Sequence, residues 1–241
     1  MSSSIMDIHG QCLLDYLNGE KKAFYLLHRD DGFVYPPIYA KEFFYEADEF
    51  PEIDKIALDS CYGGVLDIGA GAGSHSLFLQ KKGLEVVPID NSPKAVEVMK
   101  RRGLKNARAG GLFDEYEKSF DTVLLLLGIG IVENLQGLDR FLNYLPSILT
   151  QHGQLLTDSF DVRNHDDEKY REYQSKKVAN GKYFGERTLR FEYKGKMSDW
   201  FEWMHIDPET LRKQVHNSGL FFDLIATGDN GRYLSIIRRK R

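Results

Sequence analysis

The feature that most constrains the fold is a glycine-rich turn, VLDIGAGAG, at residues 65–73. An apolar strand pattern runs through Asp67 into the glycines, and a helical pattern follows over residues 74–82. A second strand pattern at residues 84–89 ends on a second acid, Asp90. This unit predicts a nucleoside site, because glycines let a ligand approach the backbone and the second acid can accept hydrogen bonds from a ribose diol.

The order of the glycines distinguishes two kinds of nucleoside cofactor. A dinucleotide fingerprint reads G-x-G-x-x-G, and its pyrophosphate rests on the helix N-terminus. Here the glycines are Gly69, Gly71 and Gly73, and Ser74 follows them. Asp67 precedes the loop, where a carboxylate suits an ammonium better than a pyrophosphate. S-adenosylmethionine (SAM) has a ribose, an ammonium and a sulfonium but no phosphate, so the pattern favours SAM over NAD.

At these residues the chain resembles the class I SAM-dependent methyltransferases. Residues 65–73 resemble their first motif, and Asp90 with the following Asn91 and Ser92 resembles their second, acidic motif. The resemblance covers residues 62–160 well and implies a Rossmann-like α/β fold, SAM as cofactor and S-adenosylhomocysteine (SAH) as product. The residues it implies for cofactor binding are Asp67, Gly69, Ala70, Gly71, Gly73, Asp90, Asn91, Ser92, Gly111, Leu112, Leu127 and Gly128.

One segment departs from this family pattern. Many members carry an acid at the third strand that meets the adenine amine, whereas residues 106–112 read NARAGGL and no acid occurs before Asp114. We therefore expect backbone and apolar groups to contact the adenine.

Apolar runs alternate with helical patterns along the chain, which is typical of a parallel sheet with helices on both faces. The expected strands are residues 65–69, 84–89, 107–109, 120–127, 154–160, 221–226 and 233–238. The expected helices are residues 74–82 with Ser74 as N-cap, 92–102, 135–149 and 208–218, and helical patterns also occur at 5–18 and 20–28. A turn at residues 228–231 makes the last two strands antiparallel. The sequence therefore predicts an α/β, Rossmann-like, mostly parallel sheet of seven strands with an antiparallel last strand.

Two segments lie outside this sheet. Residues 1–50 form a predicted N-terminal helical and aromatic segment, and residues 51–241 form the methyltransferase domain, in which 161–206 is an insertion. The insertion contains a predicted β-hairpin that turns at Lys194-Gly195-Lys196. Because substrates bind beyond the carboxyl ends of the strands, we expect residues 33–45 and 183–204 to cover the acceptor. Any single aromatic of the hairpin can equally pack on the sheet edge.

Methyl transfer from a sulfonium is an in-line displacement that needs a base only when the acceptor arrives protonated. Asp158 and Asp161 lie at the carboxyl end of the fifth predicted strand, near the expected position of the acceptor. His205 alternates with the aromatic residues of the hairpin, a position that also suits a histidine packed in the core. We name these three residues as catalytic candidates. His165 lies in a charged, solvated run and His75 on the first turn of a helix, where it caps or packs.

Composition bounds the partners. The 241 residues carry a net charge of −4, so no overall basic field attracts nucleic acid. Cys12 and Cys61 form no disulfide framework or metal-ligand cluster, which indicates a reducing compartment and no metal site. The start of the sequence lacks a signal-peptide pattern, and the longest apolar run, 123–132, is about half of the ~20 residues that a membrane span needs. We expect a cytoplasmic protein without a membrane partner, and its oligomeric state stays open.

The predicted function is methyl transfer from SAM to a small or medium organic acceptor. A protein- or RNA-directed methyltransferase is an alternative that rests on the charged run 163–177 and the basic residues 238–241. A non-catalytic SAM-binding protein is another, since no base stands out. An NAD-dependent reductase is opposed by Asp67 and Ser74. A DNA amino-methyltransferase is disfavoured because residues 127–131 read LGIGI rather than Asn/Asp-Pro-Pro-aromatic.

Overall fold

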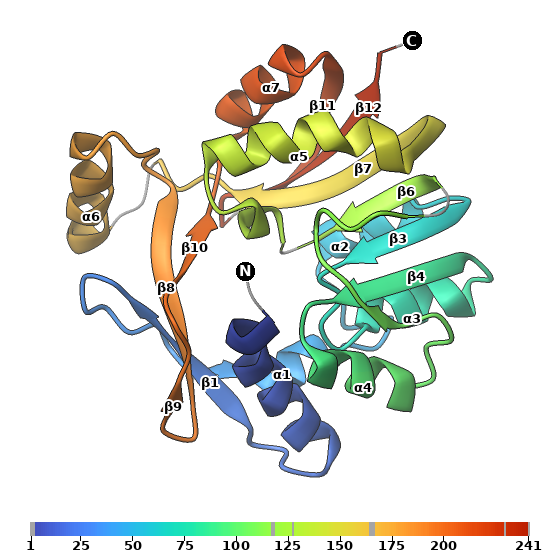
Figure 1. Ribbon diagram of the computed structural model, residues 1–241, viewed down its shortest axis with the longest axis horizontal. Coiled ribbons are helices and arrows are strands. Elements are labelled where there is room, and N and C mark those ends of the chain that lie inside the picture. The colour runs from blue at the N-terminus through green and yellow to red at the C-terminus, as the bar shows by residue number, and fades with distance from the viewer. Residues whose placement is uncertain (1–2, 117–118, 127, 164–166, 229, 241) are drawn as a thin grey trace. The chain divides into compact units, whose positions relative to one another are not determined.

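The computed structural model describes residues 3–116, 119–126, 128–163, 167–228 and 230–240 (Figure 1). The chain divides into two compact units: Met1–Asp114 with Thr188–Phe201, and Glu115–Arg187 with Glu202–Arg241. The candidates Leu127 and His165 lie outside the described residues, as do Asp229 of the expected turn and Arg241 of the basic residues 238–241.

The main sheet has seven strands in the order β11-β12-β7-β6-β3-β4-β5. The strands of the first unit are β3 (Gly64–Ile68), β4 (Glu85–Asp90) and β5 (Arg108–Ala109). Those of the second unit are β6 (Phe120–Leu125), β7 (Leu149–Phe160), β11 (Leu220–Thr227) and β12 (Arg232–Arg239). The β3–β4, β4–β5 and β6–β7 pairs are parallel, whereas β12 runs antiparallel to both β7 and β11. The predicted sheet with its reversed last strand is confirmed.

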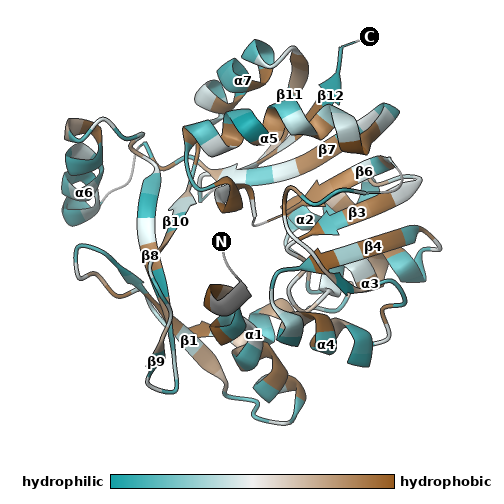
Figure 2. Cartoon of the chain, in the orientation of Figure 1, coloured by the Kyte–Doolittle hydropathy of each residue, from teal (hydrophilic) through white to brown (hydrophobic). Residues whose placement is uncertain are grey.

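The middle strands are apolar because both of their faces are covered. Val65 and Leu66 of β3 and Val123 and Leu124 of β6 have no exposed surface. These strands are among the hydrophobic elements in Figure 2. Because these strands are buried on both faces, they hold the start of each following loop in place. The residues of the candidate site lie in those loops.

Four α-helices belong to the first unit: α1 (Ser3–Leu17), α2 (Glu52–Asp59), α3 (Ser74–Lys81) and α4 (Pro93–Arg101). Helix α1 packs against α4, and Gly10 makes this approach possible, because a Cβ there would lie 2.0 Å from Ser92 Oγ. Asp7 of α1 also forms an ion pair with Lys94 of α4. The N-terminal helix is thereby fixed beside the residues that follow Asp90.

A second sheet has the order β10-β8-β1-β2, with β9 paired to β8. Its strands are β1 (Phe24–Arg29), β2 (Ile38–Tyr39), β8 (Glu186–Tyr193), β9 (Lys196–Met197) and β10 (Phe201–Met204). The predicted hairpin is confirmed, since β8 and β9 pair antiparallel around Lys194 and Gly195, both at positive φ. The helical pattern expected at 20–28 is wrong. Residues of β1 pair with β8, for example Leu27 with Phe191, a partner too distant in sequence for periodicity to reveal.

The second unit contains α5 (Leu135–Ile148), α6 (Glu168–Ala179) and α7 (Pro208–Asn217), and the short 3-10 helix η2 (Ile129–Val132). Asp207 caps α7, the helix expected at 208–218 from the sequence, and accepts a hydrogen bond from the Thr210 N–H. Helix α6 was not predicted, because its hydrophilic surface gives little periodicity (Figure 2). No helix among the described residues is long and apolar enough to cross a membrane.

Candidate active site

The glycine loop after β3 has a backbone conformation that residues other than glycine rarely adopt. Gly69, Gly71 and Gly73 have φ of 71°, 55° and 78°. The N–H groups of Gly69 and Ala70 donate to the carbonyl of Ile89, at 2.9 and 3.0 Å, which ties the loop to the end of β4. A Cβ at Gly69 or Gly71 would meet nothing within 4 Å among the described atoms, so this face of the loop is open to a ligand.

The start of α3 differs from the sequence prediction. The N-cap position is Gly73, not Ser74, because the left-handed Gly73 ends the loop and Ser74 is already helical. The Ser74 hydroxyl instead donates to the Phe43 carbonyl at 2.8 Å. A Cβ on Gly73 would lie 2.4 Å from Leu104 Cδ1, so this third glycine serves packing.

Arg102, which lies outside the glycine motif, stabilises the loop through hydrogen bonds. Arg102, just after α4, donates to the Ala72 carbonyl at 2.6 Å and to Ser74 Oγ at 3.0 Å. Its guanidinium also lies over the Phe44 ring, 4.7 Å from the centroid. Sequence reasoning missed Arg102, because it used residues 92–102 only as a helix.

Asp90 lies at the end of β4 and is 3% exposed. Its Oδ2 accepts a hydrogen bond from the Gly71 N–H at 2.9 Å, and its Oδ1 accepts one from the Ser92 N–H at 2.8 Å. Burial raises the pKa of this carboxyl group, and the two N–H donors oppose that rise. Each carboxylate oxygen retains a further lone pair, so the oriented group can still accept from a diol.

Asp67 lies within β3, where it is 3% exposed. Its Oδ2 accepts a hydrogen bond from the Ser76 hydroxyl at 2.6 Å. Burial raises the pKa of Asp67, while the nearby His75 and the Ser76 bond lower it. A buried carboxylate of this kind gains stability from a cation, such as the ammonium of a ligand.

The loop after β5 brings a third acid to this region. The Gly111 N–H donates to Asp114 Oδ2 at 2.9 Å, and the Gly110 N–H donates to the Asp90 carbonyl at 3.1 Å. Leu112 is buried, and a Cβ on Gly111 would lie 3.1 Å from Asn91 Oδ1. Asp114, which the sequence pattern set aside, therefore lies in the same loop as the glycines expected at the adenine.

The first unit thus gathers its predicted cofactor residues at the ends of β3, β4 and β5. Ser92 also N-caps α4 by accepting from the Ala95 N–H at 3.3 Å. The chemistry of this set fits SAM: an oriented buried carboxylate for a diol, a second carboxylate for an ammonium, and an open glycine face. The described residues contain no group of three or more His, Cys, Asp or Glu side chains able to hold a metal ion.

In the second unit, both predicted carboxylates at the end of β7 are paired with arginines. Asp158 is 1% exposed and accepts from Arg232 Nε at 2.6 Å. Asp161 accepts two bonds from Arg163, one to each carboxylate oxygen, at 2.9 and 2.6 Å. The Arg163 bond lowers the pKa of Asp161. Each carboxylate thus has its charge balanced by an arginine.

His205 lies just after β10, and its ring stacks on Phe160 with centroids 5.1 Å apart. Arg187 Nη2 hydrogen-bonds His205 Nδ1, a contact that sequence reasoning missed. Burial first, and the Arg187 charge second, lower the pKa of His205 well below its ordinary value. The imidazole is therefore neutral at physiological pH.

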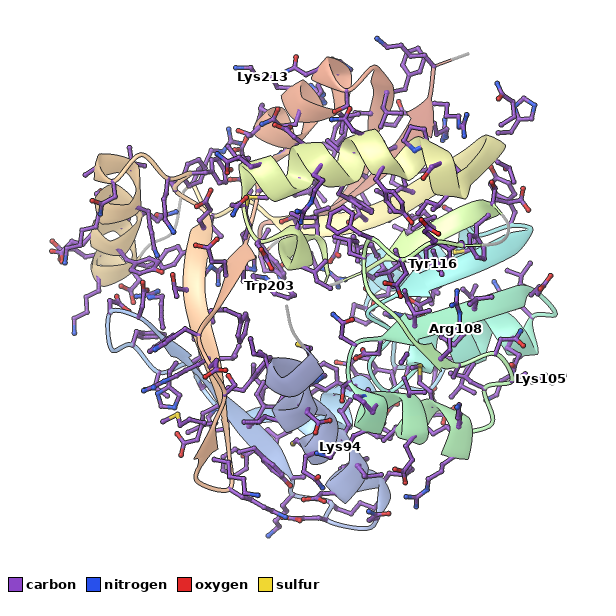
Figure 3. All side chains as sticks on the ribbon, in the orientation of Figure 1. Lys94, Lys105, Arg108, Tyr116, Trp203 and Lys213 are labelled. Carbon is purple, nitrogen blue, oxygen red and sulfur yellow. The ribbon has the colours of Figure 1, made fainter. Side chains whose placement is uncertain are left out.

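A small cavity lies beside Asp158 and His205 within the second unit. It has a volume of about 40 Å³ and is lined by residues 128–130, 158–160 and 203–205. Trp203 lies against the short η2 helix (Figure 3), so closely that a Cβ on Gly130 would be 2.2 Å from Trp203 Nε1. Three predicted residues, Gly128, Asp158 and His205, therefore line the cavity. Asp161 follows the lining residue Phe160 in the sequence and does not itself line the cavity.

Comparison with known proteins agrees with this geometry. A family model described as a methyltransferase domain matches residues 65–153. Demethylmenaquinone methyltransferase from Tropheryma whipplei (strain Twist) is 30% identical over 101 residues. That match covers 40% of this chain, and it spans only about two fifths (41%) of the relative's length.

Solved structures match over more of the chain. The methyltransferase CcbJ from Streptomyces caelestis has a TM-score of 0.56 at 12% identity, covering 80% of this chain and 94% of that chain, which shows the fold alone. A SAM-dependent methyltransferase from Bacteroides fragilis, solved in complex with SAH, has a TM-score of 0.86 and 32% identity. That match covers 99% of this chain and 97% of the other. The chain belongs to the class I SAM-dependent methyltransferases.

Proposed function

We propose that this methyltransferase acts on a small or medium organic acceptor, whose reacting group enters the cavity lined by Phe160, Trp203 and His205. The observation that carries the proposal is this cavity at the carboxyl ends of β6 and β7. Ligands of α/β sheets bind at such strand ends. A volume of about 40 Å³ admits the reacting group of an acceptor.

The residues of the first unit have separate proposed roles toward SAM, which supplies an electrophilic methyl group when bound. Asp90 accepts hydrogen bonds from the ribose hydroxyls, and Asp67 attracts the ammonium group. Gly111, Leu112 and Asp114 contact the adenine. Arg102 holds the glycine loop in its binding conformation, because it anchors the Ala72 carbonyl.

The residues of the second unit supply position rather than a strong base. Asp158 and Asp161 are already paired with Arg232 and Arg163. We therefore propose that both carboxylates fix the end of β7, and that His205 is the group that contacts the acceptor. The apolar rings of Phe160 and Trp203 limit water, which would compete as a nucleophile.

The test is a transfer assay with methyl-tritiated SAM. The purified enzyme is incubated with a cell extract divided into a low-molecular-mass filtrate, a protein fraction and total RNA. We expect label in the filtrate, and mass spectrometry then identifies the product. Label confined to protein or RNA would contradict the proposal. A quinol belongs among the defined acceptors tried next, because of the partial similarity to demethylmenaquinone methyltransferase.

A further inference from the structure

We infer that the acceptor's nucleophile is an oxygen anion, a carboxylate or an acidic phenolate, held by the Nε2–H group of His205. The inference rests on the proposed function and names its substrate class. It follows from the hydrogen-bonding state of His205 and from the charges around the cavity in the second unit.

The contact with Arg187 fixes which nitrogen of His205 carries the proton. A guanidinium has only donors, so Nδ1 must be the acceptor in its bond with Arg187. Because burial and the Arg187 charge keep the imidazole neutral, its single proton resides on Nε2. His205 therefore presents a donor to a ligand. A general base would need the opposite tautomer.

The orientation of this donor is fixed by neighbouring groups. The ring stacks on Phe160 at an interplanar angle of 25°. The backbone N–H of His205 donates to the Gly185 carbonyl at 2.9 Å. An N–H group held in place by such contacts stabilises a charge without reorganising, as an oxyanion hole does.

The charges around the cavity favour an anion over an amine. Asp158 is the one acid among the described residues of the lining, and the Arg232 guanidinium balances its charge. Arg187 places a positive charge on the far side of the imidazole. An alkylamine arrives protonated and must lose a proton before it attacks, but these groups offer no ready proton acceptor.

The reaction of an oxygen anion balances without a proton transfer. An oxygen lone pair forms the new O–CH₃ bond while the C–S bond breaks, and the bonding electrons stay on sulfur. The anion and the sulfonium become a neutral methyl ester or ether and a neutral thioether. His205 holds the oxygen by a hydrogen bond and neither gains nor loses a proton.

The test uses benzoate and benzylamine as probes of the full-length enzyme saturated with SAH. Nitrogen-15 NMR of the histidine rings, assigned through His205→Phe, reports the tautomer and the response to each probe. We expect the neutral Nε2–H form at pH 7, a shift of this signal with benzoate, and none with benzylamine. Benzoate affinity should fall about tenfold in His205→Phe, the loss of one hydrogen bond to a charged group.

A pair of arginine variants on β8 separates the tautomer effect from a general loss of charge. Arg187→Met removes the donor to Nδ1 and should lose the single Nε2–H form and the benzoate shift. Arg190→Met is the control, because Arg190 stacks on Trp200, 4.4 Å from its ring, and the structure places it in the first unit. The wild-type spectrum alone tests the tautomer if Arg187→Met does not fold.

The outcomes separate this inference from the proposed function. A protonated or Nδ1–H His205, no benzoate shift, or a benzylamine shift would overturn the inference. An N-, S- or C-methylated product in the low-molecular-mass filtrate would also overturn it, yet leave the proposed function standing. Label found only in protein or RNA would instead contradict the proposed function itself. An O-methylated product, a methyl ester or an aryl methyl ether, supports both.

Discussion

The backbone N–H of Gly71 donates a hydrogen bond to the carboxylate of Asp90, 2.9 Å away. The bond links the middle of the glycine loop to the tip of the second parallel strand, 19 residues later. The loop conformation and the direction of the carboxylate are therefore set by one interaction. This loop of the first unit and the cavity of the second unit can each be tested by substitution.

Asp90→Asn should weaken SAM binding by about tenfold or more, because each lost charge-assisted hydrogen bond is worth roughly 1.5–3 kcal/mol. The amide oxygen can still accept from one backbone N–H, so the fold should persist. Titration calorimetry measures the affinity and circular dichroism the fold. Asp59→Asn is the matched control, since the Asp59 side chain is 70% exposed and forms an ion pair with Lys82 within the first unit. Equal affinity in wild type and Asp90→Asn would place the ribose elsewhere.

SAM affinity should rise with pH through the acid range. Burial raises the pKa values of Asp67 and Asp90, so the free folded protein keeps these protons to a higher pH than the unfolded chain does. These groups therefore contribute stability below their unfolded pKa values and lose it as pH rises through the folded ones. SAM requires the ionised forms, so binding and protonation compete. Calorimetry from about pH 4 to pH 7 should show the rise, which begins above the ordinary Asp range near ~3.9. A flat profile would show that neither carboxylate contacts SAM.

Arg102→Met should weaken SAM binding about five- to thirtyfold, because the Ala72 carbonyl loses a charged donor worth ~1–2 kcal/mol. Arg101→Met is its neighbour and control, since Arg101 forms a 3.5 Å ion pair with Glu97 on the exposed face of α4. Fluorescence-detected SAH binding measures both variants. An equal loss in the two would mean that overall charge, and not the loop, controls affinity.

Gly130→Ala should lower the free energy of unfolding by about 1–3 kcal/mol, the usual range for overpacking. Its Cβ would approach Trp203 Nε1 to 2.2 Å and the Met204 carbonyl oxygen to 2.7 Å. Urea unfolding followed by tryptophan fluorescence measures the effect. Adding Trp203→Leu should recover part of the loss, because the smaller side chain can move from the new methyl group. Additive losses in the double variant would show that the two residues do not touch.

The sequence predicted the parallel sheet well because its signals are local. Strands β3 and β6 are largely apolar, β3 leads directly into Gly69, and β4 ends on Asp90. Capping also depends on near neighbours: Asp207 was inferred as the cap of α7, whereas the cap expected at Ser74 was wrong because the left-handed Gly73 takes that position.

The parts that failed depend on distant partners. Strand β1 looked helical because its pairing with β8 leaves no trace in the local pattern. The same is true of the site: Asp158 resembled a base until Arg232, 74 residues away, was found against it. Arg187 likewise defines the state of His205 from another strand. The expected aromatic cover over the strand ends, residues 33–45 and 183–204, stays a prediction.

The pairing of β1 with β8 also bears on how the protein is made. The edge of β1 that pairs with β8 stays unpaired until Phe191, the partner of Leu27, has been synthesised. At roughly 5–20 residues per second of synthesis, the edge stays open on the ribosome for about 8 to 30 seconds. An open strand edge recruits other chains. Nascent or truncated forms that end before Thr188 should therefore depend on chaperones or aggregate, even when their glycine loop is intact.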